Sequence, residues 1–199
     1  MTKPRLKIAI QKSGRLNQAS FEYLRERGLT FSENGHSLIQ PSTNYPLDIL
    51  YLRDDDIPEY VSRGVADFGI VGENVLQEKQ VATRIVQKLP FAECRLVIAV
   101  PENSSIRNAN DLEGERIATT YPYLLSQFLS ERGISAAVIP ISGSVEITPE
   151  LNLADAICDL VQSGATLKAH RLKPLETVLE SQAVLITSLG NLEDNFLPL

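Results

Sequence analysis

The chain has 199 residues, 43% of them hydrophobic, and a formal net charge of −6. This length suits one large domain or two small ones, and the acidic balance argues against general nucleic-acid binding. No apolar run approaches the ~20 residues that cross a bilayer, and the first residues lack the apolar stretch of a signal peptide. We therefore expect a cytoplasmic protein with no membrane contact.

Strand and helix candidates alternate along the chain, a pattern typical of an α/β fold with parallel sheets. The first part predicts a strand at residues 6–11, a helix capped by Asn17 and running to Arg27, a strand at 47–52, a helix with Pro58 in its first turn, a strand at 65–71 and a helix from Glu73. The second part predicts strands at 94–100 and 116–119, a helix opened by Tyr121 and Pro122 and ended by Gly133, and strands at 136–141, 156–161, 177–180 and 183–187.

The cysteines and histidines indicate no special chemistry. Cys94 and Cys158 lie in apolar strand-like segments, as buried reduced thiols do. His36 and His170 have no cysteine or acidic residue at ligand spacing. We therefore expect no metal ion held directly by protein side chains.

The most informative segment is the loop Gln162-Ser163-Gly164-Ala165-Thr166, which follows a strand and precedes a helix start. Backbone N–H groups in such a loop can hold a phosphate, because glycine allows close approach and the helix dipole favours an anion. The alternative is an ordinary connecting turn, which is the commoner fate of a short Ser-Gly-x-Thr segment.

Acidic residues precede this loop. Asp159 stands near the end of the strand, where it could accept hydrogen bonds from the hydroxyls of a sugar attached to the phosphate. Asp155 lies four residues earlier, so both carboxylates would share one strand face. Two carboxylates in an apolar segment are costly to bury without partners, and a magnesium-bound sugar diphosphate would supply them. Glu146 ends a second small-residue turn, at residues 143–146.

This arrangement resembles the ATP phosphoribosyltransferase family, whose signature joins a Glu to a downstream Asp and a Ser/Thr-Gly-x-Thr-Leu loop. The residues in those places are Glu146, Asp159, Ser163, Gly164, Thr166 and Leu167. The resemblance extends from Leu6 to about Ile186. Asn152 stands where the family usually has Gly, and we expect the turn to survive because Asn tolerates left-handed backbone conformations.

The resemblance implies a fold of two α/β lobes of the type II periplasmic-binding-protein kind, with the active site in the cleft between the lobes. We expect the first lobe to comprise residues 1–93 and 180–199. The second lobe, residues 94–179, would carry the loop for phosphoribosyl diphosphate.

Residue pattern and resemblance together nominate the site. The sugar diphosphate would be held by Glu146, Asp155, Asp159, Ser163, Gly164, Ala165, Thr166 and Leu167. The nucleotide would be contacted by Ser13, Gly14, Gly72, Glu73, Arg95 and Tyr121. Lys12, Arg15 and Arg53 would stabilise negative charge on the departing diphosphate.

Each of these assignments has a structural alternative. Residues 12–15 could be a solvated turn, and Arg53 could pair with Asp55 or Asp56 at a helix start. A tyrosine such as Tyr121 is more often a core residue than a stacking platform.

The resemblance implies transfer of a phosphoribosyl group from 5-phosphoribosyl 1-diphosphate to N1 of the adenine of ATP, which opens histidine biosynthesis. Pyrophosphate would leave, and Mg²⁺ would be carried on the substrate diphosphate. Two alternatives stay open: a non-enzymatic ligand-binding module of the same fold, and transfer to a different base.

The family's longer members continue into a C-terminal domain that binds histidine, whereas this sequence stops at Leu199. It resembles the short form, which works with a separate subunit similar to histidyl-tRNA synthetase. A hetero-octamer with such a subunit is therefore expected, and a truncated long form is the alternative.

Overall fold

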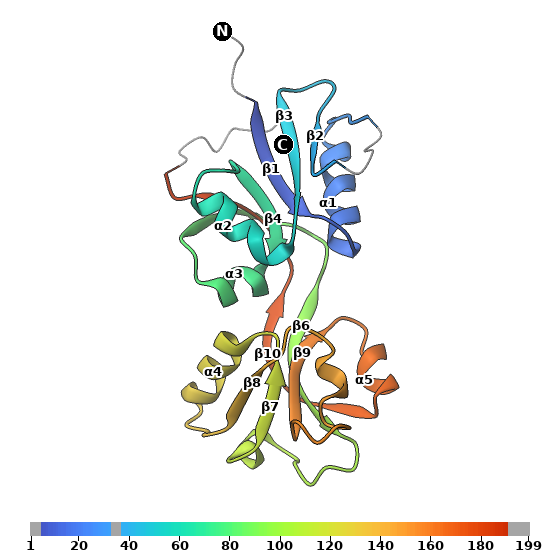
Figure 1. The fold of residues 1–199 in the computed structure, drawn as a ribbon, viewed down its shortest axis with the longest axis vertical. Helices are drawn as coiled ribbons and strands as arrows, with labels where there is room; N and C mark the ends of the chain where they lie inside the picture. The colour runs from blue at the N-terminus through green and yellow to red at the C-terminus, as the bar shows by residue number, and fades with distance from the viewer. Residues whose placement is uncertain (1–4, 33–36, 191–199) are drawn as a thin grey trace. The chain divides into compact units, whose positions relative to one another are not determined.

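The computed structural model describes residues 5–32 and 37–190, which form two compact units. The first unit takes the described residues up to Ala92 together with those from Gln182 onward, and the second spans Glu93–Ser181. The chain thus passes between the units twice. Both the blue beginning and the red end of the coloured ribbon belong to the first unit (Figure 1).

The first unit is built on a mixed sheet with the strand order β2-β3-β1-β4-β11-β5. These strands are β1 (Leu6–Gln11), β2 (Ile39–Pro41), β3 (Leu47–Leu52), β4 (Phe68–Gly72), β5 (Thr83–Lys88) and β11 (Ala183–Ser188). β3, β1 and β4 are parallel. β2 pairs antiparallel with β3, and β11 pairs antiparallel with β4 and β5.

Helices pack on both faces of this sheet. They are α1 (Arg15–Glu26), α2 (Ile57–Ser62) and α3 (Glu73–Lys79), and the 3-10 turn η1 (Asp54–Asp56) precedes α2. Tyr23 and Leu24 of α1 join one core cluster, and Ile57 and Val61 of α2 join another. Strand residues alternate between the two clusters, because successive side chains point to opposite faces of a sheet.

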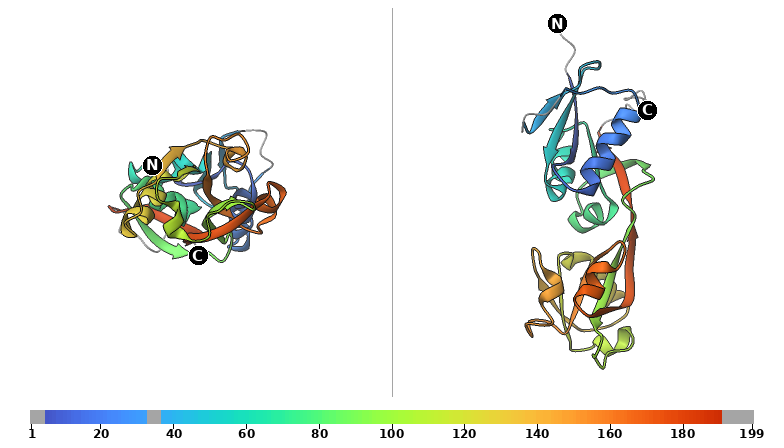
Figure 2. Two further views of the ribbon diagram at one scale, coloured as in Figure 1. Left: turned by 90° about the horizontal axis from the view of Figure 1, so that it is seen from below. Right: turned by 90° about the vertical axis from the view of Figure 1, so that its right-hand side faces the viewer.

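The second unit has a mixed sheet with the strand order β10-β6-β9-β7-β8. Its strands are β6 (Cys94–Pro101), β7 (Arg116–Thr119), β8 (Ala137–Pro140), β9 (Ala156–Val161) and β10 (Leu172–Ser181). β8, β7 and β9 are parallel, and β6 pairs antiparallel with both β9 and β10. β6 and β10 lie side by side in both sets of views (Figures 1 and 2).

Both faces of the second sheet are covered as well. The helical elements are α4 (Pro122–Glu131), α5 (Ala165–Ala169), and the 3-10 turns η2 (Ala109–Leu112) and η3 (Val145–Ile147). Leu125 and Phe128 of α4 pack into one core cluster, whereas Val145 and Leu167 pack into the other. α5 therefore lies against the sheet through Leu167, directly after the loop that follows β9.

The predicted α/β fold is confirmed, with a correction to the sheets. Within the described residues, three neighbouring strands of each sheet are parallel and the other strand pairings are antiparallel, so neither sheet is purely parallel. Four strands begin and end where the sequence predicts them: β1, β3, β7 and β9.

Other boundaries differ from the predictions. α1 begins at Arg15, and Asn17 does not cap it, because Asn17 Nδ2 donates to the carbonyl oxygen of Gln11 at 2.6 Å. β4 begins at Phe68 instead of Val65. β10 is longer than predicted because register shifts near Pro174 interrupt the alternation by which a strand is recognised. β2 and β5 were not predicted; β2 is very short, and none of the β5 side chains is buried.

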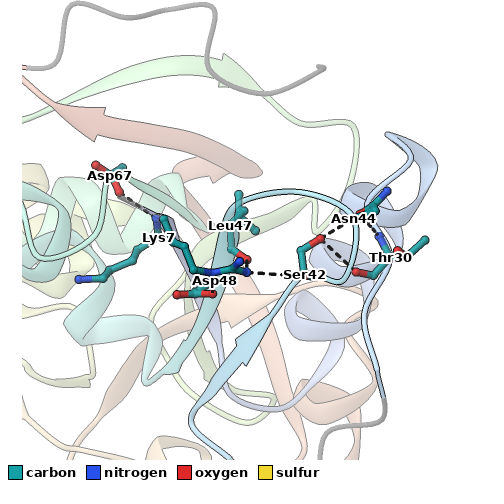
Figure 3. Close-up of polar contacts among 8 residues, drawn as sticks. Lys7, Thr30, Ser42, Asn44, Leu47, Asp48 and Asp67 are labelled. Carbon is teal, nitrogen blue, oxygen red and sulfur yellow. Dashed lines mark hydrogen bonds and ion pairs between the residues drawn. The ribbon is translucent and has the colours of Figure 1, made fainter. Parts of the chain in front are cut away.

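Polar contacts join the edge of the first sheet at which β1, β3 and β4 begin (Figure 3). Asp67 Oδ2 accepts the backbone N–H of Lys7 at 2.8 Å. Arg5 Nε donates to Asp48 Oδ1 at 2.6 Å. Further hydrogen bonds in the same network involve Thr30, Ser42 and Asn44. This edge is therefore held by the chain's own groups.

Candidate functional site

In the second sheet, most of the predicted phosphate-binding residues follow the C-terminal ends of the parallel strands β7, β8 and β9. Thr119, the last residue of β7, pairs in register with Pro140 of β8 and with Cys158 of β9. Parallel strands end along one edge, where open α/β sheets bind their ligands. The segments that follow the three strands contain Tyr121, residues 143–146 and residues 162–166.

The loop after β9 has a backbone suited to an anion. Gly164 takes φ +77°, a left-handed conformation that is costly for most other residues, and it is the N-cap of α5. Ser163 and Thr166 are exposed beside it. In the part of the chain that the structure describes, the N–H groups of Ser163 and Gly164 donate no hydrogen bond. Consecutive N–H groups of this kind can donate to phosphate oxygens.

Leu167 anchors this loop. Its side chain is only 6% exposed and packs in a cluster with Val97, Val161 and Leu172. That Leu167 contacts the substrate stays a prediction, since its side chain is largely buried here and also lines the hollow described below. Its contribution is to hold α5, and with it the loop, against the sheet.

Two carboxylates lie close together near this loop: Glu146 from η3 and Asp159 from β9. Burial raises the pKa of Asp159, and the negative charge of Glu146 raises it further. The backbone N–H of Leu160, which donates to Asp159 Oδ1 at 2.8 Å, acts in the opposite direction. A raised carboxyl pKa means that the ionised form is undercompensated by the chain. Sugar hydroxyls or a cation carried by a ligand would provide that compensation.

Asp155 stands at the other end of β9 and has its partner within the chain. Arg116 donates from Nε to Asp155 Oδ2 at 2.9 Å and from Nη2 to Asp155 Oδ1 at 2.8 Å. These hydrogen bonds lower the pKa of Asp155 to about 2. The prediction that a substrate-borne metal supplies the partner of Asp155 is therefore wrong.

The turn before β9 behaves as predicted. Asn152 takes φ +57°, which confirms that asparagine adopts the left-handed conformation here. Its carbonyl oxygen accepts a hydrogen bond from Arg116 Nη1 at 2.9 Å. The same arginine that pairs with Asp155 thus also fixes this turn.

A hollow of about 540 Å³ opens beside the loop, within the second unit. Its lining comprises Gln162, Ser163 and Gly164 of the loop, Leu167 and Lys168 of α5, Arg95, Val97 and Val161 of two neighbouring strands, and Leu172, Pro174, Leu175, Glu176 and Thr177 of β10. Arg95 pairs in register with Val161, the last residue of β9. The structure thus places Arg95 beside the loop that follows β9.

Lys168 is a candidate that sequence reasoning missed. It is exposed, lines the hollow and follows Thr166 by two residues on α5. That position, in the first turn of a helix after a phosphate loop, is the one signal that could have identified it. Arg95 was nominated for the nucleotide, and nothing in the sequence connected it with this loop.

Tyr121 has the surroundings of a core residue. It is half-buried against the cluster that contains Leu125 and Phe128. Its backbone N–H donates to Thr119 Oγ1 at 2.9 Å, which shapes the start of α4. The structural alternative therefore explains this tyrosine without a bound nucleotide.

The first unit has a comparable edge, where Gln11 of β1 pairs in register with Leu52 of β3. Residues 12–15 and Arg53 follow these strands, so they lie at neighbouring strand ends and are exposed. Asp55 pairs with Lys79 at 3.5 Å. Among the described residues, Arg53 itself makes no ion pair, so the alternative of a structural pair with Asp55 or Asp56 is not what the structure shows.

Gly72 and Glu73, at the end of β4, have roles inside the chain. Lys88 Nζ lies 3.0 Å from Glu73 Oε2, so this carboxylate is paired. A Cβ atom on Gly72 would lie 2.4 Å from Asn74 Oδ1, which explains the glycine by close approach of a side chain. Neither residue needs a nucleotide to account for it.

Some classes of site find no support in the described part of the chain. Residues 5–32 and 37–190 contain no group of three His, Cys, Asp or Glu side chains placed to hold a metal ion. His36 lies outside the described residues. None of the described helices has the length and apolar character to cross a membrane.

Comparisons with known proteins identify similar sequences. The family model for ATP phosphoribosyltransferase matches residues 53–196. The curated ATP phosphoribosyltransferase of Maricaulis maris (strain MCS10) is 48% identical over 188 residues, which cover 92% of this chain. The chain spans 64% of the length of that relative.

Solved structures give the same result for the fold. The ATP phosphoribosyl transferase (HisG:HisZ) complex from Thermotoga maritima matches with a TM-score of 0.79 and 31% identity, covering 92% of this chain and 87% of the matched chain. The periplasmic aliphatic sulphonate binding protein SsuA from Escherichia coli matches with a TM-score of 0.63 and 16% identity, covering 94% and 66% of the two chains. The predicted periplasmic-binding-protein-like fold is thereby confirmed.

Proposed function

Because the chain belongs to the ATP phosphoribosyltransferase family, we propose that it transfers the phosphoribosyl group of 5-phosphoribosyl 1-diphosphate to N1 of the adenine of ATP, opening histidine biosynthesis in the cytoplasm. The bond between C1 of the ribose and the diphosphate oxygen breaks, a bond from adenine N1 to C1 forms, and pyrophosphate leaves. The observation that carries this proposal is the loop after β9, with Gly164 in a left-handed turn close to the undercompensated Asp159.

The second unit would bind the sugar. N–H groups and hydroxyls of Ser163, Gly164, Ala165 and Thr166 would hold the 5-phosphate, and Asp159, with Glu146 beside it, would accept hydrogen bonds from the ribose hydroxyls. A sugar fixed at both ends presents C1 in one orientation. With such positioning, much of the entropy that a two-substrate reaction must lose is lost when the substrates bind, so it no longer adds to the barrier of the chemical step.

Cations would stabilise the leaving group. Negative charge grows on the diphosphate as its bond to C1 breaks, and preorganised positive charge lowers the barrier at that point. Lys12, Arg15 and Arg53 are exposed at neighbouring strand ends, and Ser13 and Gly14 contribute backbone N–H groups in the same turn. Arg53 suits this role best, because no acidic side chain among the described residues neutralises it.

The proposed reaction would use a magnesium ion that the substrate carries. Mg²⁺ would be held by diphosphate oxygens, where it would neutralise leaving-group charge. Adenine N1 carries its own lone pair, so no general base is assigned.

We propose in addition that the chain assembles with a separate subunit similar to histidyl-tRNA synthetase, as a hetero-octamer. Support comes from its likeness to the HisG:HisZ complex of Thermotoga maritima. Feedback by histidine would then depend on the partner.

One assay separates the proposed transferase from a ligand-binding module and from transfer to a different base. The chain is mixed with ATP, phosphoribosyl diphosphate and Mg²⁺, with and without a histidyl-tRNA-synthetase-like subunit, and pyrophosphate release is followed. Release that requires both substrates supports the proposal. Binding without turnover in either condition would instead support a ligand-binding module, which the shared fold with SsuA allows. Turnover with another base in place of ATP would redirect the proposal to a different acceptor.

A further inference from the structure

A chain of hydrogen bonds connects the first turn of α1 to the ends of β1 and β3. Asn17 Nδ2 donates to the carbonyl oxygen of Gln11 at 2.6 Å. The N–H of the same peptide group, which belongs to Lys12, donates to the carbonyl oxygen of Leu52 at 2.7 Å. That carbonyl in turn belongs to the peptide group that leads into Arg53. One half-buried amide thus holds, through two peptide groups, the backbone from which two exposed cations extend.

The hydrogen bonds restrain the backbone at both cations. A peptide group that is bonded at both its oxygen and its N–H cannot rotate without losing a hydrogen bond, so the direction in which the chain enters Lys12 is set. At Arg53, the carbonyl oxygen accepts the N–H of Asp56 at 3.0 Å, so this residue is held on both sides. Hydrogen bonds in such a chain polarise and strengthen one another. Loss of the Asn17 amide would therefore weaken the next hydrogen bond as well.

The turn after β1 needs a restraint of this kind because it contains Gly14. This residue takes φ +95° and ψ −174°, a conformation that is essentially restricted to glycine. Glycine has more backbone freedom than any other residue, and here it lies between Lys12 and the start of α1. The contact from Asn17 back to the end of β1 spans the glycine and reduces the freedom of the whole turn.

We propose that Asn17 is a positioning residue for the transfer reaction, which aligns Lys12 and Arg53 with the departing diphosphate. This inference rests on the proposed function and adds to it a residue that acts through these cations and not by contact with a substrate. Preorganised charge lowers the barrier because nothing has to be rearranged when the leaving group gains its charge. A backbone that must first be ordered loses part of that benefit, so the amide of Asn17 affects kcat more than KM.

A purely structural role makes a different prediction. If Asn17 only stabilised the start of α1, its loss would change the kinetics by the same factor whether or not the cations were present. If it acts through Lys12, its loss should have little effect once that cation has been removed. A double-mutant cycle measures this coupling between two residues.

The experiment runs this cycle in the complete pyrophosphate-release assay. Asn17→Leu removes the amide and keeps a side chain of similar shape, and it should lower kcat about fivefold while KM changes less than about twofold. In the Lys12→Gln background the same substitution should lower kcat less than about twofold, because the aligned cation is absent. In the Asp159→Asn background, which alters the second unit, the full effect of about fivefold should remain.

Gln18→Met is the matched control on the same helix. Gln18 Nε2 donates to Glu22 Oε1 at 3.1 Å on the exposed surface, so this substitution also removes an amide hydrogen bond from α1. Its kcat and KM should equal those of the wild type. Hydrogen exchange of the Lys12 amide gives a readout that does not depend on catalysis. Exchange should be about fivefold faster in Asn17→Leu and unchanged in Gln18→Met.

The outcomes separate this inference from the proposed function. If the wild type releases pyrophosphate with both substrates, but Asn17→Leu lowers kcat by the same factor in the Lys12→Gln and Asp159→Asn backgrounds, the inference fails and the function stands. It also fails if Asn17→Leu raises KM without lowering kcat, or if exchange of the Lys12 amide does not change. Faster exchange with an unaltered kcat overturns it too, because the hydrogen bonds would then hold the turn without serving the reaction. A wild type without turnover, with or without the partner subunit, overturns both.

Discussion

In both sheets, the edge at which the parallel strands begin differs from the edge at which they end in how its polar groups are paired. At the edge where the parallel strands begin, side chains bind to the chain itself: Asp67 accepts the N–H of Lys7, and Arg116 forms a two-pronged contact with Asp155. At the edge where the strands end, the exposed Arg53 makes no ion pair among the described residues. At the first edge these polar groups are paired within the chain, whereas at the second some groups are paired, such as Glu73 with Lys88, and others, such as Arg53, make no ion pair among the described residues.

Asp155 and Asp159, at the two ends of β9, show this difference in the pairing of polar groups. The first has a pKa lowered to about 2 by Arg116, and the second has a pKa raised by burial and by Glu146. A lowered carboxyl pKa stabilises the fold at neutral pH, whereas a raised one costs stability. Substitutions along this strand should therefore separate stability from binding, and the predictions below test this separation in order of decreasing effect.

The largest effect is expected where the strands end. Asp159→Asn combined with Thr166→Val removes a carboxylate and a hydroxyl from the proposed sugar site. kcat/KM for phosphoribosyl diphosphate should fall about 100-fold, since two charge-assisted hydrogen bonds are lost. Thr166 is exposed, so the thermal unfolding transition should persist. Steady-state kinetics and circular dichroism provide the two measurements.

Asp155→Asn is the matched control for that double variant, because it makes the same chemical change at the other end of β9. Its kcat and KM should match those of the wild type. If the two variants had equal kinetic effects, the contrast between the edges would have no functional meaning, and an unimpaired double variant would remove Asp159 and Thr166 from the site.

A smaller kinetic effect is expected from Arg53→Ala. Loss of one preorganised cation should lower kcat about 30-fold and change KM less than about threefold, because the leaving group gains its charge only as the bond breaks. Arg63→Ala, which removes an exposed arginine paired with Glu59 on α2, serves as the control. A rise in KM without a fall in kcat would show that Arg53 contributes only to docking of the ground state.

Sequence patterns predicted the loop and the strands around it because their information is local. Gly164 and the apolar run of β9 follow from residue type and spacing, whereas the left-handed Asn152 was expected from the resemblance to a family that usually has Gly there. Partners from distant segments could not be predicted in this way. Arg116 reaches Asp155 across 39 positions, and Arg95 lines the same hollow as Lys168 because β6 pairs with β9.

The missed strand β5 and the strand β10, which was predicted only in part, have a similar explanation. β5 and β10 have no clean alternation of apolar and polar residues, because β5 has no buried side chain and β10 contains register shifts. Their positions are fixed by pairing with β11 and β6, which is information that a single segment does not carry. Tertiary pairing, and not local propensity, determines these strands.

The third prediction concerns stability at the edge where the strands begin. Asp155→Asn should lower the free energy of unfolding by about 1 kcal/mol at neutral pH, because a charge-assisted pair is replaced by a neutral contact. The pKa of Asp155 is about 2 in the fold against 3.8 for the free group. The contribution of Asp155 to stability is thus complete when the pH is above its pKa in the unfolded chain, and it is lost as the pH falls through its pKa in the fold.

Urea unfolding of the two proteins across this acid range measures that contribution. The difference in the free energy of unfolding between wild type and Asp155→Asn should shrink as the pH approaches the pKa of Asp155 in the fold. Other acidic groups titrate equally in both proteins. A difference that stayed constant with pH would mean that the ion pair with Arg116 does not account for the stability of this edge.

The smallest effect should have the opposite sign. Asp159→Asn alone should raise the free energy of unfolding at neutral pH by about 0.5 kcal/mol, because it removes a partly buried charge that the chain undercompensates. The pKa of Asp159 is raised in the fold, so the native state binds its proton more readily than the unfolded state does. Its stabilising contribution is present below the unfolded pKa and disappears as the pH rises through the folded pKa. The variant and the wild type should therefore be equally stable in acid and diverge as the pH rises, as urea unfolding at several pH values can show. A variant less stable than the wild type at neutral pH would mean that Asp159 is a structural residue like Asp155, and the two ends of β9 would then serve the same purpose.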